Sequence, residues 1–148
     1  MDAVKQRRLI AESQVFSLLE SSEEELLAGG KILDEMAARI LDTIYTKGTF
    51  LDLVKQKRFK ASTITLGGEP AFVMVYTINA LGWLTIEGVA SLKKSPFKLV
   101  FDAGDLLARH YGCNNIQFVT KLASLYRFGL ARGYKTVGVI MCKNAPPA

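Results

Sequence analysis

The chain has 148 residues, of which 49% are hydrophobic and 22% are charged, a size and composition typical of one globular domain with a substantial core. A formal net charge of +5 favours an anionic ligand, such as a phosphorylated cofactor or a nucleic acid, but it does not amount to a basic tail. Polar residues and Gly82 interrupt the longest apolar stretch, residues 71–86, so we expect no membrane span.

Residues 1–60 are predicted to be mainly helical. The opening of the chain is charged, and its sparse apolar residues, Val4, Leu9 and Ile10, predict a short and partly exposed helix. It lacks the apolar region of about 7–15 residues that marks a secretory signal peptide, so we expect a cytoplasmic protein. The next apolar run, residues 14–19, is too short to distinguish a strand from the end of a helix.

Further helix signals follow this run. Ser22 and Glu25 have the spacing of a capping box, in which each side chain accepts a hydrogen bond from a free amide, so a helix is predicted to begin just after the serine. Apolar residues recur every three or four positions over 32–45, which predicts an amphipathic helix. The basic run 55–60 is interpreted as a solvated helix end or as a nucleic-acid patch with Phe59 as its aromatic residue.

An antiparallel meander of three strands is predicted in the middle of the chain. Residues 61–66 alternate in polarity, Gly67 and Gly68 form a tight turn, and residues 69–78 continue as a second strand. A second turn leads into residues 83–92, which are apolar on both faces and form the predicted central strand.

The last third of the chain alternates helices with strands. Residues 97–111 have helical spacing, 115–120 form a short strand, 121–132 a second helix and 135–143 a closing strand. Strands that alternate with helices of this length imply βαβ crossovers and parallel pairing, with helices on both faces of the sheet. The predicted fold class is therefore α+β or α/β, a mixed sheet in which an antiparallel meander precedes a βαβαβ unit, in a single domain over residues 1–148.

A cationic loop is predicted between the central strand and the next helix. Ser95 followed by Pro96 is a strong helix start, since serine favours the cap position and proline the first helical position. Lys93 and Lys94 come directly before it, so two ammonium groups, the helix dipole and free amides are expected to converge on a phosphate. In the alternative interpretation, Ser95 already satisfies amides of the first turn and both lysines are solvated.

Several other residues are given structural roles. His110 is expected at a helix C-terminus, where the dipole favours a cation, and Asp105 and Arg109 are expected to form a weak i, i+4 surface pair. Cys113 and Cys142 lack metal-ligand spacing, so we expect reduced, buried thiols and no metal site.

The order of elements over residues 61–143 resembles the GNAT superfamily of acyl-CoA-dependent N-acyltransferases, in which a meander leads to a central strand, a pyrophosphate loop and alternating helices and strands. Gly133 and Tyr134 stand where that family frequently has Gly-Phe after its last helix. The resemblance implies transfer of an acyl group from acetyl-CoA, or another acyl-CoA, to an amine on a small molecule or a protein.

The chain departs from the GNAT pattern in two places. The family's loop usually carries glycines that let the backbone approach the pyrophosphate, whereas residues 91–99, SLKKSPFKL, contain none. The side chains of Lys93, Lys94 and Ser95 would therefore have to supply the contacts. Gly129 stands where such enzymes often have a tyrosine that acts as general acid.

Glu87 and Gly88 are the best chemical candidates. A glycine within a strand predicts a bulge or a close backbone approach, and the resemblance implies a bulge here, at which Gly88 and Val89 help to position the thioester. Partial burial of Glu87 would raise its pKa and suit it to take a proton from an amine, directly or through water. The alternative is an ordinary solvent-facing carboxylate.

Two functions of different classes stay open at this point. The first is a divergent N-acyltransferase, favoured by Gly88 and the two loop lysines. The second is a non-catalytic scaffold of the same fold that binds a partner protein or a nucleic acid through its N-terminal third, favoured by the missing glycines. Either function is compatible with a homodimer.

Overall fold

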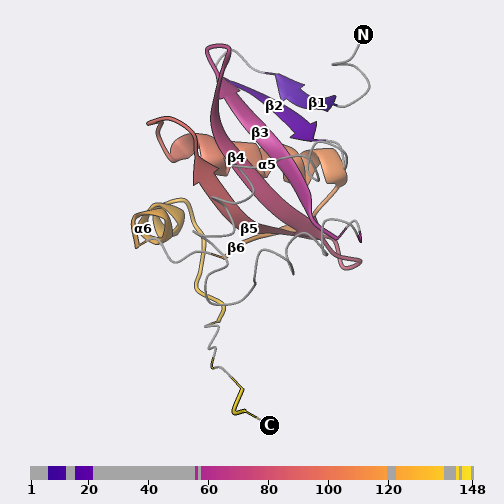
Figure 1. Cartoon of the computed structure of the whole chain (residues 1–148), viewed down its shortest axis with the longest axis vertical. Helices are drawn as coiled ribbons and strands as arrows, with labels where there is room; N and C mark the ends of the chain where they lie inside the picture. Colours follow the sequence, from indigo (N-terminus) through magenta and orange to yellow (C-terminus); the bar gives the residue numbers. More distant parts are fainter. Residues whose placement is uncertain are drawn as a thin grey trace.

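The computed structural model describes residues 7–12, 16–21, 56, 58–119, 123–138, 143 and 145–147. In this part of the chain a six-stranded sheet follows the order β1-β2-β3-β4-β5-β6, with α5 crossing one face and α6 beside the β5–β6 side (Figure 1). The elements are β1 (Arg7–Glu12), β2 (Phe16–Ser21), β3 (Lys60–Leu66), β4 (Glu69–Ile78), β5 (Trp83–Ser91), α5 (Lys98–Tyr111), β6 (Asn115–Phe118) and α6 (Ala123–Ala131).

Elements that are neighbours in the sequence are neighbours in the sheet. β1 to β5 pair antiparallel in succession, and β5 then pairs parallel with β6 after the crossover through α5. Gly67 and Gly68 form the turn between β3 and β4, with φ angles of 60° and 81° that a residue with a Cβ atom rarely adopts. The predicted meander and the βαβ unit after it are confirmed.

The main core lies between α5 and one face of the sheet. Val100 and Leu107 on α5 are fully buried, because the helix presents its apolar stripe to the strands. Each such side chain contributes about 1.5–3 kcal/mol on burial. The buried sheet residues of this cluster include Phe72, Met74, Tyr76, Leu84 and Ile86. This packing fixes α5, and with it the loop that precedes the helix.

An aromatic cluster attaches α6 to α5 and β6. The ring centroid of Phe101 on α5 lies 4.7 Å from that of Phe118, 5.3 Å from that of Phe128 and 5.4 Å from that of Tyr134. A Cβ atom at Gly129 would lie 3.5 Å from the Phe101 ring, an ordinary van der Waals distance, so α6 packs directly against this ring at Gly129.

Arg132, just past the end of α6, reinforces this attachment. Its Nη2 atom donates to Asp102 Oδ1 at 3.0 Å and to Asp105 Oδ2 at 3.3 Å. The predicted pair of Asp105 with Arg109 is therefore wrong: the Arg132 guanidinium reaches two carboxylates of α5 at once, and Arg109 makes no ion pair within the described ranges.

Residues 7–12, part of the predicted short helix, form a strand instead. β1 pairs with β2 from Arg7 to Glu12, with a register shift between Leu9 and Ala11, so inter-strand pairing outweighs the weak local preference of the sequence RRLIAE. β2 also resolves the ambiguous run at 14–19 as part of a strand, with Phe16 and Leu18 buried.

Some predictions lie outside the described residues. These are the helices expected between residues 23 and 54, and residues 139–142 of the expected closing strand; residues 135–138 of that strand are irregular. Of the helices that the structure describes, none has the length and apolar character needed to cross a membrane.

Candidate functional site

A β-bulge interrupts the pairing of β4 with β5 at Glu87. Val75 lies opposite Gly88, and the next residue of β4, Tyr76, lies opposite Ile86. Glu87 is therefore the extra residue on β5. The bulge predicted from Gly88 is confirmed, and it bends the strand at the candidate proton acceptor.

The same place marks the separation of β5 from β6. Their parallel pairing ends with Ile86 opposite Phe118, and one further hydrogen bond runs from Val119 N to Ile86 O at 3.0 Å. β5 continues to Ser91, so its edge over residues 87–91 faces no strand on the β6 side in the described part of the chain. An unpaired strand edge offers N–H and C=O groups that an extended ligand can bind.

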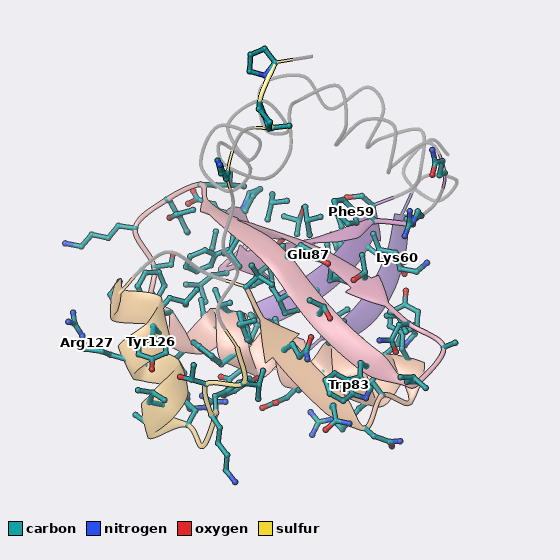
Figure 2. The ribbon with its side chains drawn as sticks, turned by 90° about the horizontal axis from the view of Figure 1, so that it is seen from below. Phe59, Lys60, Trp83, Glu87, Tyr126 and Arg127 are labelled. Atoms are coloured by element: carbon teal, nitrogen blue, oxygen red, sulfur yellow. The ribbon has the colours of Figure 1, made fainter. Side chains whose placement is uncertain are left out.

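Glu87 is half-buried near the middle of the sheet (Figure 2). Thr77 on β4 donates a hydrogen bond from Oγ1 to Glu87 Oε2 at 3.0 Å. Burial raises the pKa of the Glu87 carboxyl above its ordinary value of 4.5, and the hydrogen bond from Thr77 opposes this rise. A carboxylate with a raised pKa is a stronger base, so Glu87 is suited to accept a proton.

The loop between β5 and α5 is fastened to the β3–β4 hairpin. Leu92 N and Lys93 N both donate to Ala71 O, at 2.8 and 3.4 Å. The Lys93 ammonium group donates to Leu66 O at 3.3 Å and to Glu69 Oε2 at 3.1 Å. Lys93 therefore holds the loop against the hairpin, and Glu69 partly neutralises its charge.

The N-terminus of α5 has no side-chain cap. Ser95 is not the cap that the sequence predicts, because Pro96 O accepts from Leu99 N at 3.2 Å and the cap residue is Phe97, which offers no side-chain hydrogen bond. The Ser95 hydroxyl is buried and lacks a hydrogen-bond partner among the described residues. The amides of Phe97 and Lys98 likewise donate to no described residue, so this helix end has free donors for an anion.

The structure places the candidate residues along one strand and its exit. Glu87, Gly88 and Val89 lie at the bulge, whereas Lys94 and Ser95 lie past the end of the same strand. Lys94 is exposed and has no ion pair with any residue that the structure describes. The candidate base and the candidate anion site are thus successive parts of one segment.

His110 and Cys113 lie at the other end of α5. The His110 ring packs edge-on against Tyr111, with centroids 4.7 Å apart, and the residue is exposed. Burial raises the pKa of the Cys113 thiol, which favours the protonated form. Cys142 lies outside the described residues, and within them no group of three acidic, histidine or cysteine side chains is placed to hold a metal ion.

Thr77 is the site residue that sequence reasoning missed. The sequence places it near the end of a strand, where a threonine is ordinary. Its contact with Glu87 depends on the register of β4 and β5 and on the bulge, which shifts that register by one residue. The sequence did contain one signal for this contact, the short turn predicted between the strands at 69–78 and 83–92. Strands joined by such a turn lie side by side, so polar residues on the same face of the two strands can come into contact.

Comparison with known proteins adds a fold likeness. No protein-family model matches the chain, and no curated protein matches it. A solved structure of a possible acetyltransferase from Clostridium difficile 630 matches with a TM-score of 0.59 and 12% identity, over 91% of this chain and 100% of that chain. Aminoglycoside N-acetyltransferase AAC(6')-Iy in complex with CoA matches with a TM-score of 0.58 and 10% identity, over 90% and 97%.

A third structure is of a different kind. A transcriptional regulator from Bacillus halodurans C-125 matches with a TM-score of 0.58 and 19% identity, over 88% of this chain and 99% of that chain. At such identities the likeness establishes a shared fold, and proteins that share a fold can differ in activity.

Proposed function

We propose that this chain, which has the fold of the GNAT superfamily, is a divergent N-acyltransferase that transfers an acyl group from acyl-CoA to an amine. One observation carries the proposal: Glu87 is the bulge residue at the point where β5 and β6 separate. Amine acyl transfer needs a proton acceptor beside a place for an extended thioester, and the bulge brings a raised-pKa carboxyl to a strand edge that no described strand covers.

The loop residues fit the diphosphate of CoA even without the glycines of the family's loop. Ser95 offers a buried hydroxyl that has no partner in the described ranges, and the first turn of α5 offers free amides at the positive end of its dipole. Lys94 adds an exposed cation. Lys93 supports this surface indirectly, because its ammonium group is engaged by Glu69.

In this proposal the protein removes a proton from the acceptor amine and orients the thioester. Acyl-CoA supplies an acyl group already activated as a thioester. Glu87 takes a proton from the protonated amine, directly or through water, which frees the electron pair with which the nitrogen attacks the thioester carbonyl carbon. The C–S bond breaks, and CoA leaves as a thiolate that takes up the second nitrogen proton through solvent. Backbone groups at Gly88 and Val89 align and polarise the thioester carbonyl, since preorganised donors stabilise the charge that develops on its oxygen.

The acceptor belongs to the class of amines, on a small molecule or on a protein. A small-molecule acceptor is supported by the aminoglycoside acetyltransferase with the same fold. A panel of a polyamine, an aminoglycoside and a peptide with a free N-terminus separates the two kinds of acceptor by rate.

The test measures release of free CoA thiol from acetyl-CoA with each amine of this panel. Glu87→Gln should lower kcat by roughly 10²- to 10⁴-fold, the usual contribution of a general base. Glu20→Gln is the matched control, because Glu20 is a buried glutamate of β2 that takes no part in the proposed chemistry. An unchanged rate in Glu87→Gln would contradict the assignment.

Binding is tested separately by thermal unfolding with acetyl-CoA. A ligand at about 100 times its Kd adds roughly 2.7 kcal/mol to the free energy of unfolding. No rise in melting temperature at millimolar acetyl-CoA would remove the acyltransferase proposal.

The second candidate function is a non-catalytic scaffold that binds a partner protein or a nucleic acid. Its supporting observation is the loop itself, which has no glycine over residues 91–99 and uses Lys93 to hold Glu69. Absence of acetyl-CoA binding, together with nucleic-acid binding that weakens steeply with salt, would favour this function.

A further inference from the structure

The Glu87 carboxylate is held by one of its two oxygen atoms. Thr77 Oγ1 donates to Oε2 at 3.0 Å, and Oε1 has no hydrogen-bond partner among the residues described. An ionised carboxylate only accepts hydrogen bonds, so the threonine hydroxyl must be the donor, and the contact favours the ionised form.

Thr77 is well placed to fix an orientation. It lies on β4, between β3 and β5 in the sheet, and opposite Thr85, which precedes Glu87 by two residues on the same face of β5. Threonine is branched at Cβ and has few χ1 rotamers, so the position of its hydroxyl group is more restricted than that of a polar group on a longer side chain. Figure 2 shows Glu87 in the middle of the sheet, well away from Tyr126 and Arg127 on α6.

Neighbouring polar groups cannot replace this contact. Thr85 Oγ1 donates to Gln117 Oε1 at 3.3 Å, so its hydrogen is already used. Both of these neighbours are uncharged, and none of the ion pairs among the described residues includes Glu87. Thr77 is thus the single described donor to this carboxylate.

We infer that Thr77 is a positioning residue, which holds Glu87 by Oε2 so that Oε1 receives the proton of the acceptor amine. A proton passes from the protonated amine to Oε1, and the freed electron pair of the nitrogen attacks the thioester carbonyl carbon. The C–S bond then breaks, and CoA leaves as a thiolate that takes up, through solvent, the second proton that the nitrogen releases. This inference rests on the proposed acyl transfer. It goes beyond it in assigning different tasks to the two carboxylate oxygens.

The test compares Thr77→Val, which keeps the shape and removes the hydroxyl, with Thr77→Ser, which keeps the hydroxyl. In the free protein, the pKa of Glu87 measured by carboxyl-carbon NMR should rise by roughly one unit in Thr77→Val, because a hydrogen bond that favours the ionised form is lost. The acid limb of the pH–rate profile should move by the same amount.

The kinetic parameters should separate positioning from binding. In Thr77→Val we expect kcat to fall by roughly 10-fold at the optimum pH with KM nearly unchanged, since a misaligned base affects the chemical step. Thr77→Ser should restore most of kcat. Thr85→Val is the matched control: it removes a neighbouring hydroxyl of the same face without touching Glu87, and it should leave both the pKa and kcat unchanged.

Two results would overturn the inference, and they are distinguishable from failure of the proposed function. An equal Glu87 pKa in wild type and Thr77→Val, in variants with unchanged folding, shows that Thr77 does not act on the carboxylate. A shifted pKa with unchanged kcat and pH profile shows that the contact has no part in the reaction. If wild type has no acyltransfer activity, the proposed function fails and the assignment to the amine proton fails with it, while the NMR titration still decides whether Thr77 controls Glu87.

Discussion

Each face of β4 carries one polar contact, and the two contacts differ in how many of their polar atoms have a hydrogen-bond partner among the described residues. Tyr76, on the face covered by α5, shares a hydrogen bond of 2.7 Å with Ser62, and both residues are fully buried. Thr77, the next residue, points to the opposite face and donates to the half-buried Glu87. The first contact closes a polar pair inside the core, whereas the second leaves one oxygen of the Glu87 carboxylate without a partner among the described residues.

The two faces also differ in whether their half-buried or buried carboxylate, Glu20 on one face and Glu87 on the other, lies beside a cation. Glu20 lies on the α5 side with its side chain 9% exposed, and the Lys60 ammonium group lies 3.7 Å from it. Glu87 has no cation within ion-pair distance among the described residues. A buried carboxylate with a cation serves the fold, whereas one whose burial is compensated only by a hydroxyl has its pKa raised, which is how functional carboxyls are commonly made.

Removing the cation from the first face should have the largest effect on stability. Lys60→Met removes the Lys60 contact of the buried Glu20 carboxylate, and breaking a buried pair by deleting one partner costs about 3–5 kcal/mol when both charges are buried. Since the Lys60 side chain is 41% exposed and water can reach it, we expect a loss of about 2 kcal/mol. Urea unfolding monitored by circular dichroism measures this difference.

A double-mutant cycle shows whether the loss comes from the pair. Glu20→Gln combined with Lys60→Met should be less destabilised than the sum of the two single variants, because no unpaired charge remains. Lys98→Met, which removes a surface contact of 3.9 Å to Asp102, is the matched control and should change the stability by less than about 0.5 kcal/mol. Strict additivity in the cycle would show that Glu20 and Lys60 are not coupled.

The hydroxyl pair of the first face should give the next largest effect. Tyr76→Phe leaves Ser62 Oγ buried without its 2.7 Å partner, at a cost of roughly 1–2 kcal/mol. Adding Ser62→Ala removes the unsatisfied group and should recover part of this loss. A double variant that is as unstable as the sum of both single variants would mean that the hydroxyls act independently.

The contrast between these contacts also explains which features could be predicted from sequence. The strand at 69–78 and the helix beginning near residue 97 follow from local periodicity, which neighbouring residues determine. The strand at Arg7–Glu12 could not be predicted this way, because its apolar residues gain a pattern only when β2 lies beside them. Ser95 failed as a cap because the loop geometry, rather than the serine, decides where the helix begins.

The features of the candidate site also fall into those that local sequence predicts and those that depend on contacts between distant segments. Gly88 signalled the bulge because a glycine inside a strand is a local irregularity. The role of Thr77 and the engagement of Lys93 by Glu69 depend on contacts between strands that are distant in sequence. Such contacts become visible only when the register of the sheet is known.

The smallest expected effect on stability comes from ionisation of Glu87, on the second face of the sheet. The pKa of Glu87 is raised in the folded protein, so folding favours its protonated form and ionisation destabilises the native state. This cost is absent below the ordinary value of 4.5, grows as the pH rises above it and is complete above the folded pKa. Glu87→Gln removes the cost and keeps an acceptor for Thr77.

Glu87→Gln should therefore match wild type in melting temperature near pH 4 and exceed it by roughly 2 °C near pH 8, a small rise because Glu87 is partly solvent-exposed. Glu20→Gln should show the opposite sign near pH 8, since it removes the anion that pairs with Lys60. A variant that loses activity while gaining stability has the signature of a residue kept for function at the expense of the fold. If Glu87→Gln is instead less stable than wild type near pH 8, Glu87 serves the fold as Glu20 does, and the difference between the two faces disappears.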